Sequence, residues 1–210
     1  MVKKSRKQIL SKTSAVDDQK KNITSDFITK YADYIAAALF LAISLIVWWP
    51  TRFLPYHWDS AGFVIQAAQQ LLQTNFQPFI ASYSDFAHPP LLIALVALAW
   101  KLFGQSLLIS HLLMFPFLYI LLIATYFAGK RISGPFLGFS ASLILTSVAI
   151  VLSEYGLIYL DLPMAAIATL AVTVWMYQKK WLSSIVLAVA VLIKMPALII
   201  IIPLLLYHYI

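Results

Sequence analysis

The sequence predicts an all-α, polytopic integral membrane protein with about five transmembrane helices. Hydrophobic residues make up 62% of the 210 residues, the mean hydropathy is +0.86, and only 11% of the residues are charged. A soluble domain carries roughly twice that share of charge. Several charge-free apolar runs are separated by short polar segments, and the longer ones have the length of a membrane crossing. The ten prolines and six glycines fit this class, because transmembrane helices tolerate both.

The positive charge is concentrated at the amino terminus. Eight of the fifteen Lys and Arg residues fall within residues 1–30, a polar segment directly before the first apolar run. We expect a disordered, basic cytosolic tail that orients the protein by the positive-inside rule. Attraction to anionic lipid headgroups is a second interpretation of the tail. The net charge of +7 therefore does not indicate nucleic-acid binding, and the absence of cysteine excludes disulfides and thiolate catalysis.

The apolar runs predict the order of the crossings. The first run leads outward from the cytosol and ends in the interfacial pair Trp48 and Trp49. The predicted crossings are 34–50 outward, 106–128 inward, 134–153 outward, 163–178 inward and 182–206 outward.

The segment PPLLIALVALAWKLFG decides this count. Its apolar part has about 14 residues, or roughly 21 Å of helix, against a hydrocarbon core of about 30 Å. If it crossed, the basic pairs at 130–131 and 179–180 would face outside. If it is a short re-entrant or surface helix, both pairs return to the cytosol, which the positive-inside rule favours. We therefore expect an external loop over 51–105 that contains this helix and an amphipathic helix over AGFVIQAAQQLLQ.

Four carboxylates remain beyond Asp33, and this topology puts all of them outside: Asp59, Asp85, Glu154 and Asp161. Ionisable residues are rare in membrane proteins and usually mark a site. Asp59 suits a general base, and Asp161 suits a group that orients an acceptor or binds a cation. The structural alternatives are that Asp59 and Asp161 cap helices and that Glu154 ends a span. Asp85 and Glu154 are the weaker candidates.

Two potential cations complete the candidate site. Lys194 lies in AVAVLIKMPALIIII, where burial of a lysine costs on the order of 3 kcal/mol. Snorkelling is the structural alternative, but a cavity-facing lysine that meets an anionic phosphate fits this position better. His88 precedes two prolines that set the start of a helix, and it is either structural or a contact for a phosphate or a metal.

These residues occur in an order that resembles the membrane glycosyltransferases of the C-type superfamily. The similar branch contains protein O-mannosyltransferase-like and aminoarabinose-transferase-like enzymes. The resemblance covers residues 31–210, and the matching features in chain order are HWDSAG, HPPLL, GKRISG, YLDLPMAA and LIKMPAL.

The resemblance implies that a sugar moves from a polyprenyl-phosphate donor to a lipid or protein acceptor on the extracytoplasmic face. It makes Asp59 the catalytic base and Asp161 the second external aspartate, and it makes Lys194 and His88 contacts of the donor phosphate. Ser60 stands where many members have a second acidic residue, which leaves the metal unassigned and a divalent cation open as a cofactor. Family members have more spans, so residues 31–210 are expected to be the amino-terminal part of such a domain.

The residues themselves are consistent with this chemistry. A lipid phosphate is already a good leaving group, and the chain has neither GxGxxG nor a P-loop, so no nucleotide cofactor is expected. We expect a multi-pass plasma-membrane protein with a cytosolic amino terminus. A transporter-like protein with Lys194 as its ion or substrate site and a non-catalytic membrane scaffold stay open. The acids are expected in loops, whereas proton relays usually lie within spans.

Overall fold

The computed structural model describes residues 31–58, 60–77 and 89–204. Of these residues, 84% are helical and none forms a strand, which confirms the predicted all-α class. The basic tail 1–30, Asp59, Asp85 and His88 lie outside the described residues. In chain order the elements are a helix over Tyr31–Thr51, the π-helical turn η1 (Ser60–Val64), α2 (Ile65–Gln73), α3 (Leu91–Phe103), α4 (Leu107–Ser133), α5 (Pro135–Ser147), α6 (Ala149–Gly156), α7 (Asp161–Met176), α8 (Lys180–Ile193), and the 3₁₀ segment η2 (Met195–Ile200), which continues as a helix to Leu204.

Two of these helices, Tyr31–Thr51 and α4, are long and apolar enough to cross a membrane. A third span results if α5 and α6 are counted together, although they meet at an angle of 64°. The other apolar helices are shorter, with 10 to 17 residues. The described residues therefore contain two or three helices that could span a membrane. The predicted count of five crossings is not confirmed.

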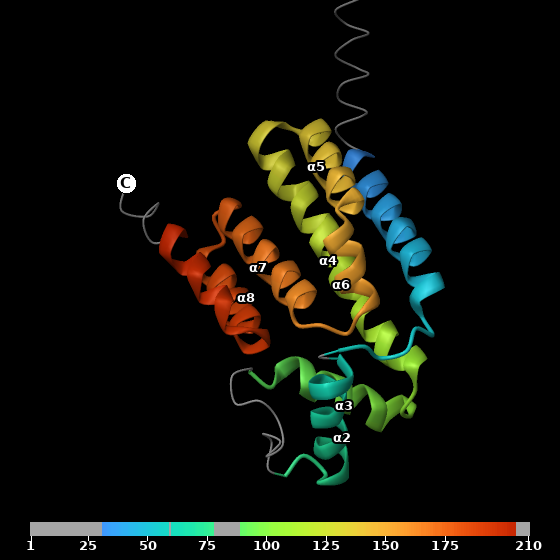
Figure 1. The fold of residues 1–210 in the computed structure, drawn as a ribbon. Coiled ribbons are helices and arrows are strands. Elements are labelled where there is room, and N and C mark those ends of the chain that lie inside the picture. Colours follow the sequence, from blue (N-terminus) through green and yellow to red (C-terminus); the bar gives the residue numbers. More distant parts are fainter. Residues whose placement is uncertain (1–30, 59, 78–88, 205–210) are drawn as a thin grey trace, which may run out of the picture.

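Helix α4 is the centre of the bundle (Figure 1). It packs against α5 and α7, and α8 packs against the other side of α7. The helix Tyr31–Thr51 joins this group through Phe40, whose ring contacts Tyr126 of α4 and Phe139 of α5. Figure 1 shows α2 and α3 gathered at one end, which we call the loop end, where α4 and α7 begin. The opposite end, where α4 and α7 finish, is called the basic end.

The segment that was predicted as an external loop contains two short helices, α2 and α3, at the loop end. Helix α3 has 13 residues, about 20 Å, which is short of a hydrocarbon core of about 30 Å. Helix α2 covers most of the predicted amphipathic stretch and packs against α3 through Ile65, Ala68 and Leu71, whereas Gln66 and Gln73 are exposed. The apolar face of α2 thus packs against α3, and its polar face is exposed.

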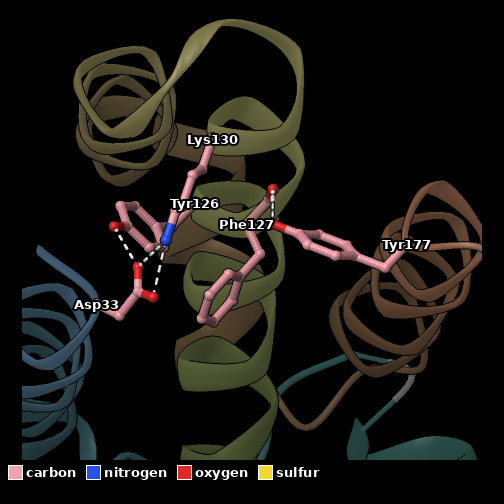
Figure 2. Close-up of polar contacts among 5 residues, drawn as sticks. All are labelled: Asp33, Tyr126, Phe127, Lys130 and Tyr177. Carbon is pink, nitrogen blue, oxygen red and sulfur yellow. Dashed lines mark hydrogen bonds and ion pairs between the residues drawn. The ribbon is translucent and has the colours of Figure 1, made fainter. Parts of the chain in front are cut away.

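A lysine–carboxylate pair holds the first helix at the basic end (Figure 2). Nζ of Lys130 lies 2.6 and 2.7 Å from the two carboxylate oxygens of Asp33, and the buried Tyr126 hydroxyl donates to the same carboxylate at 2.8 Å. The hydroxyl of Tyr177, just after α7, donates to the carbonyl of Phe127 at 3.3 Å. These bonds fix the first helix and the end of α7 on the last turns of α4.

The last apolar run differs from its prediction. The expected single crossing over 182–206 is not one helix, because α8 ends at Ile193 and Lys194 has extended backbone angles (φ −155°, ψ 129°). The chain then reverses: Met195–Leu204 packs back along α8, and Lys180 and Leu204 line one cavity. A straight helix would separate those two residues by about 36 Å. Pro196 is one cause, because it has no N–H for the carbonyl of Leu192 and would clash with it in a continuous helix.

Two glycines let α4 and α5 approach closely. A Cβ built on Gly129 would lie 2.8 Å from Cα of Gly138, and a Cβ on Gly138 would overlap the carbonyl oxygen of Tyr126. Small residues at such contacts are a usual device for helix packing in membranes. The hydroxyl of Ser142 adds an interhelical bond of 2.9 Å to the carbonyl of Leu122.

We predict that Gly138→Ala lowers the melting temperature of the purified protein. Helix propensity alone would favour alanine by about 1 kcal/mol, but overpacking of this contact costs about 1–3 kcal/mol. Gly62→Ala is the matched control, because a Cβ there meets no atom within 4 Å. Thermal unfolding followed by circular dichroism checks both variants. Equal stability of the two variants would contradict the close approach of α4 and α5.

Candidate functional site

Two residues singled out from the sequence form an ion pair at the loop end. Nζ of Lys194 donates to Oδ1 of Asp161 at 2.6 Å, and the exposed fractions of the two side chains are 22% and 52%. Asp161 begins α7 and Lys194 directly follows α8, so the antiparallel packing of these helices brings together residues 33 positions apart. The structure therefore gives the half-buried lysine a counter-charge within the protein.

The ion pair changes the interpretation of Asp161. The N-cap of α7 is Leu160, and no side chain makes the capping hydrogen bond. The capping alternative therefore does not hold for Asp161, which occupies the first position of the helix. A carboxylate there is favoured by the positive end of the helix dipole. Its carboxylate instead accepts a hydrogen bond from Lys194, in line with a role in a site.

Glu154 lies beside this pair, although the sequence favoured it less. It lines a cavity of about 340 Å³ together with Asp161, and the other lining residues are apolar side chains of α4, α6 and α7. Oε2 of Glu154 is buried without a hydrogen-bond partner in the described part of the chain. The carboxyl group is close enough to interact electrostatically with both Asp161 and Lys194. A buried polar oxygen without a partner is costly, so a ligand, a water molecule or a proton at this position would stabilise it.

The sequence analysis expected the acidic residues in loops, but Glu154 lies in a helix. It is part of α6, which is turned by 64° from α5 at the extended residue Val148. Neither proline nor glycine is at this break, so no local signal in the sequence marks it. The bend carries the end of α6 to the start of α7, and this brings Glu154 to the cavity.

A polar cluster holds the segment before Asp59 against α3 and α4. The hydroxyls of Tyr56 and Ser110 hydrogen-bond at 2.8 Å, and Nε1 of Trp100 donates to the same Ser110 oxygen at 2.8 Å. Nε2 of the buried His111 pairs with the carbonyl of Leu54 at 2.9 Å. Burial raises the pKa of Tyr56, and its bond to Ser110 opposes part of that rise. Tyr56 thus stays a neutral hydrogen-bonding group at physiological pH.

Sequence reasoning missed this cluster, because its members are far apart in the chain and none is unusual in type. The only available signal was a serine and a histidine at the start of an apolar helix. The ring nitrogen Nδ1 of His111 is buried and has no partner among the described residues. The cluster is a positioning device: it fixes the chain three residues before Asp59.

The predicted base Asp59 and the predicted phosphate contact His88 lie outside the described residues, whereas the segment that leads to Asp59 is described up to Trp58. Trp58 precedes Asp59, is 84% exposed and has a positive φ of 47°. A Cβ on Gly156, at the end of α6, would touch Leu54 and Thr51 at 3.5 and 3.7 Å. The segment that leads to Asp59 therefore attaches at the end of the bundle that holds Asp161 and Lys194. In the parts of the chain that the structure describes, no group of three metal-ligating side chains comes together.

We predict that the ion pair is coupled energetically. Lys194→Met and Asp161→Asn should each lower the melting temperature, because each leaves a charge without its partner. The double variant should lose less than the sum, with a coupling on the order of 1 kcal/mol. Lys101→Met is the control, since that exposed lysine donates to the neutral amide of Asn75 and lies 5.3 Å from the ring centre of Phe76, so its loss leaves no charged partner there. Strict additivity would show that the pair contributes nothing.

Comparison of the chain with models of protein families, with curated proteins and with solved structures finds no match.

Proposed function

We propose that the chain contributes the donor-phosphate site of a membrane glycosyltransferase that uses a polyprenyl-phosphate sugar on the extracytoplasmic face. The observation that carries the proposal is the Asp161–Lys194 ion pair beside the cavity of Glu154. A second support is that the segment leading to Asp59 attaches at the same end of the bundle. A cation, carboxylates and a surrounding apolar body are the groups that transfer from a lipid phosphate requires.

The proposed reaction is a single displacement at the anomeric carbon of the sugar. The acceptor hydroxyl oxygen forms the new glycosidic bond while the bond between that carbon and the phosphate oxygen breaks. The carboxylate of Asp59 takes the hydroxyl proton, and polyprenyl phosphate leaves with the bonding electrons. Lys194, with His88 as a second contact, stabilises the negative charge that develops on the phosphate. No group is oxidised or reduced, and no nucleotide takes part.

The ion pair has a specific part in this reaction. Before the donor binds, the carboxylate of Asp161 lies 2.6 Å from the ammonium of Lys194 and balances its charge. An ammonium has three donor hydrogens, so it can keep the bond to Asp161 and also bind a phosphate oxygen. Glu154 and Asp161 line a cavity in which we place the hydroxyls of the sugar. A divalent cation beside these carboxylates is compatible with the same arrangement.

The proposed orientation puts the loop end outside the plasma membrane and the amino terminus in the cytosol. Lys130, Arg131 and Lys179 are at the basic end, where α4 and α7 finish. The positive-inside rule favours this end for the cytosolic side.

This orientation predicts which residues react from outside the cell. The chain contains no cysteine, so Trp58→Cys and Lys179→Cys give clean single-site probes at exposed positions of the two ends. A membrane-impermeant maleimide applied to intact cells should label residue 58, whereas residue 179 should react only after permeabilisation. Labelling of both positions from outside would show that the two ends are not on opposite sides.

We predict that Asp59→Asn lowers sugar transfer by about 10²–10⁴-fold, because the acceptor loses its general base. The measurement is transfer from radiolabelled polyprenyl-phosphate sugar in membranes that contain the chain. Asp85→Asn is the matched control, since it makes the same change in the same external segment. Lys194→Met should raise the KM for the donor more than it lowers kcat. Full turnover by Asp59→Asn would remove that residue from catalysis.

Transport coupled to a proton or cation is the second candidate function. It is favoured by the bend between α5 and α6, which brings Glu154 next to an ion pair, with its Oε2 buried and without a hydrogen-bond partner among the described residues. Discontinuous helices and buried carboxylates are typical of ion sites in transporters. Proteoliposomes separate the two functions: proton flux that is lost in Glu154→Gln but kept in Asp59→Asn supports transport. A scaffold would show neither transfer nor flux.

A further inference from the structure

A second cavity lies on the opposite side of the α7–α8 hairpin from Glu154. It has a volume of about 620 Å³ and is formed where Met195–Leu204 folds back along α8. Its walls are mainly aliphatic, with Leu187, Val191 and Leu192 from α8 and Leu198, Ile201 and Leu204 from the returning segment. We call this cavity the hairpin groove.

The hairpin groove has one polar end. Its polar lining residues Lys180, Ser183 and Ser184 all belong to the first turns of α8, whereas the lining from Leu187 to Leu192 is apolar. The distance along α8 from Lys180 to Leu192 is about 18 Å, close to the depth of one bilayer leaflet of about 15 Å. The groove therefore matches a molecule with a polar group at the basic end and an apolar chain that reaches the middle of the membrane.

The charge around the polar end is positive. Lys180 lines the groove, Lys179 directly precedes it in the chain, and Lys130 and Arg131 lie at the same end of the bundle. Asp33 is the one carboxylate that the described residues have at this end, and it bonds Lys130. An anionic headgroup is thus favoured over a zwitterionic one.

Exposed aromatic rings mark the depth of this end. The side chain of Trp181 is 78% exposed and that of Phe136, in the first turn of α5, is 84% exposed. Tryptophan is enriched at the level of the lipid headgroups. We therefore infer that the polar end of the groove lies at the level of the phospholipid phosphates.

We propose that the hairpin groove binds one anionic phospholipid of the leaflet at the basic end. One acyl chain fills the groove between α8 and Met195–Leu204, and the phosphate contacts the ammonium groups of Lys179 and Lys180. This site is separate from the ion pair of Asp161 and Lys194, which lies at the other end of α7 and α8. It therefore does not depend on the proposed sugar transfer.

Native mass spectrometry of the full chain tests the site. The detergent-solubilised protein is mixed with equal amounts of phosphatidylglycerol and phosphatidylcholine, and we expect it to retain phosphatidylglycerol preferentially. Lys179→Gln and Lys180→Gln should each reduce that retention about fivefold, as expected for one lysine near an anionic lipid surface. Lys101→Gln, which removes an exposed lysine from the loop end, should leave it unchanged.

A second pair of variants tests the groove itself. Ala188→Trp fills the cavity from an exposed lining position and should abolish retention of the lipid, whereas Val189→Trp, on the next residue outside the cavity, should not. A phosphatidylglycerol with a photoreactive acyl chain should cross-link to α8 or to Met195–Leu204. Equal retention of both lipids, no effect of Ala188→Trp, or cross-links confined to other helices would overturn the proposal.

Discussion

Lys194 is a half-buried cation at the loop end of an apolar bundle, and much of the carboxy-terminal half of the structure follows from how its charge is balanced. A lone ammonium among apolar side chains costs several kcal/mol, so it needs a counter-charge or a path to water. Asp161 supplies the counter-charge from the first turn of α7. Helices α7 and α8 have 16 and 14 residues, about 24 and 21 Å, so an antiparallel hairpin brings its two ends to the same level. The reversal after α8 then forms the wall of the hairpin groove.

The basic end repeats this arrangement with different helices. Lys130 and Asp33 form an ion pair between α4 and the first helix, and the hydroxyl of Tyr126 completes the hydrogen bonding of the carboxylate. The two ion pairs have different surroundings, however. The carboxylate at the basic end also accepts a hydrogen bond from a tyrosine, whereas Asp161 lines a cavity together with Glu154, whose Oε2 has no hydrogen-bond partner among the described residues. The first arrangement is that of a structural clamp, and the second is the one that we propose as a site.

Local patterns in the sequence were sufficient for the helices but not for their partners. Hydropathy and length predicted α4 and α7 to within a few residues, and the amphipathic period predicted α2. Lys194 and Asp161 stood out because charge is rare in this chain. Their contact depends on how α7 and α8 pack, which no local pattern encodes. No proline or glycine in the sequence indicates the bend at Val148, so the position of Glu154 was not predictable. Pro196 was a visible signal for the end of α8, but the length of the apolar run outweighed it.

We propose that the ammonium of Lys194, which pairs with Asp161, binds the phosphate of a lipid-linked sugar. Solid-state nuclear magnetic resonance of ¹⁵N-lysine-labelled protein in bilayers can measure this directly, with polyprenyl monophosphate as the ³¹P partner. The resonance of Lys194 is assigned by its loss in Lys194→Met. The account predicts a dipolar coupling between this nitrogen and the phosphate that corresponds to a direct hydrogen bond. A lysine that stays uncoupled to phosphorus at saturating lipid would contradict it.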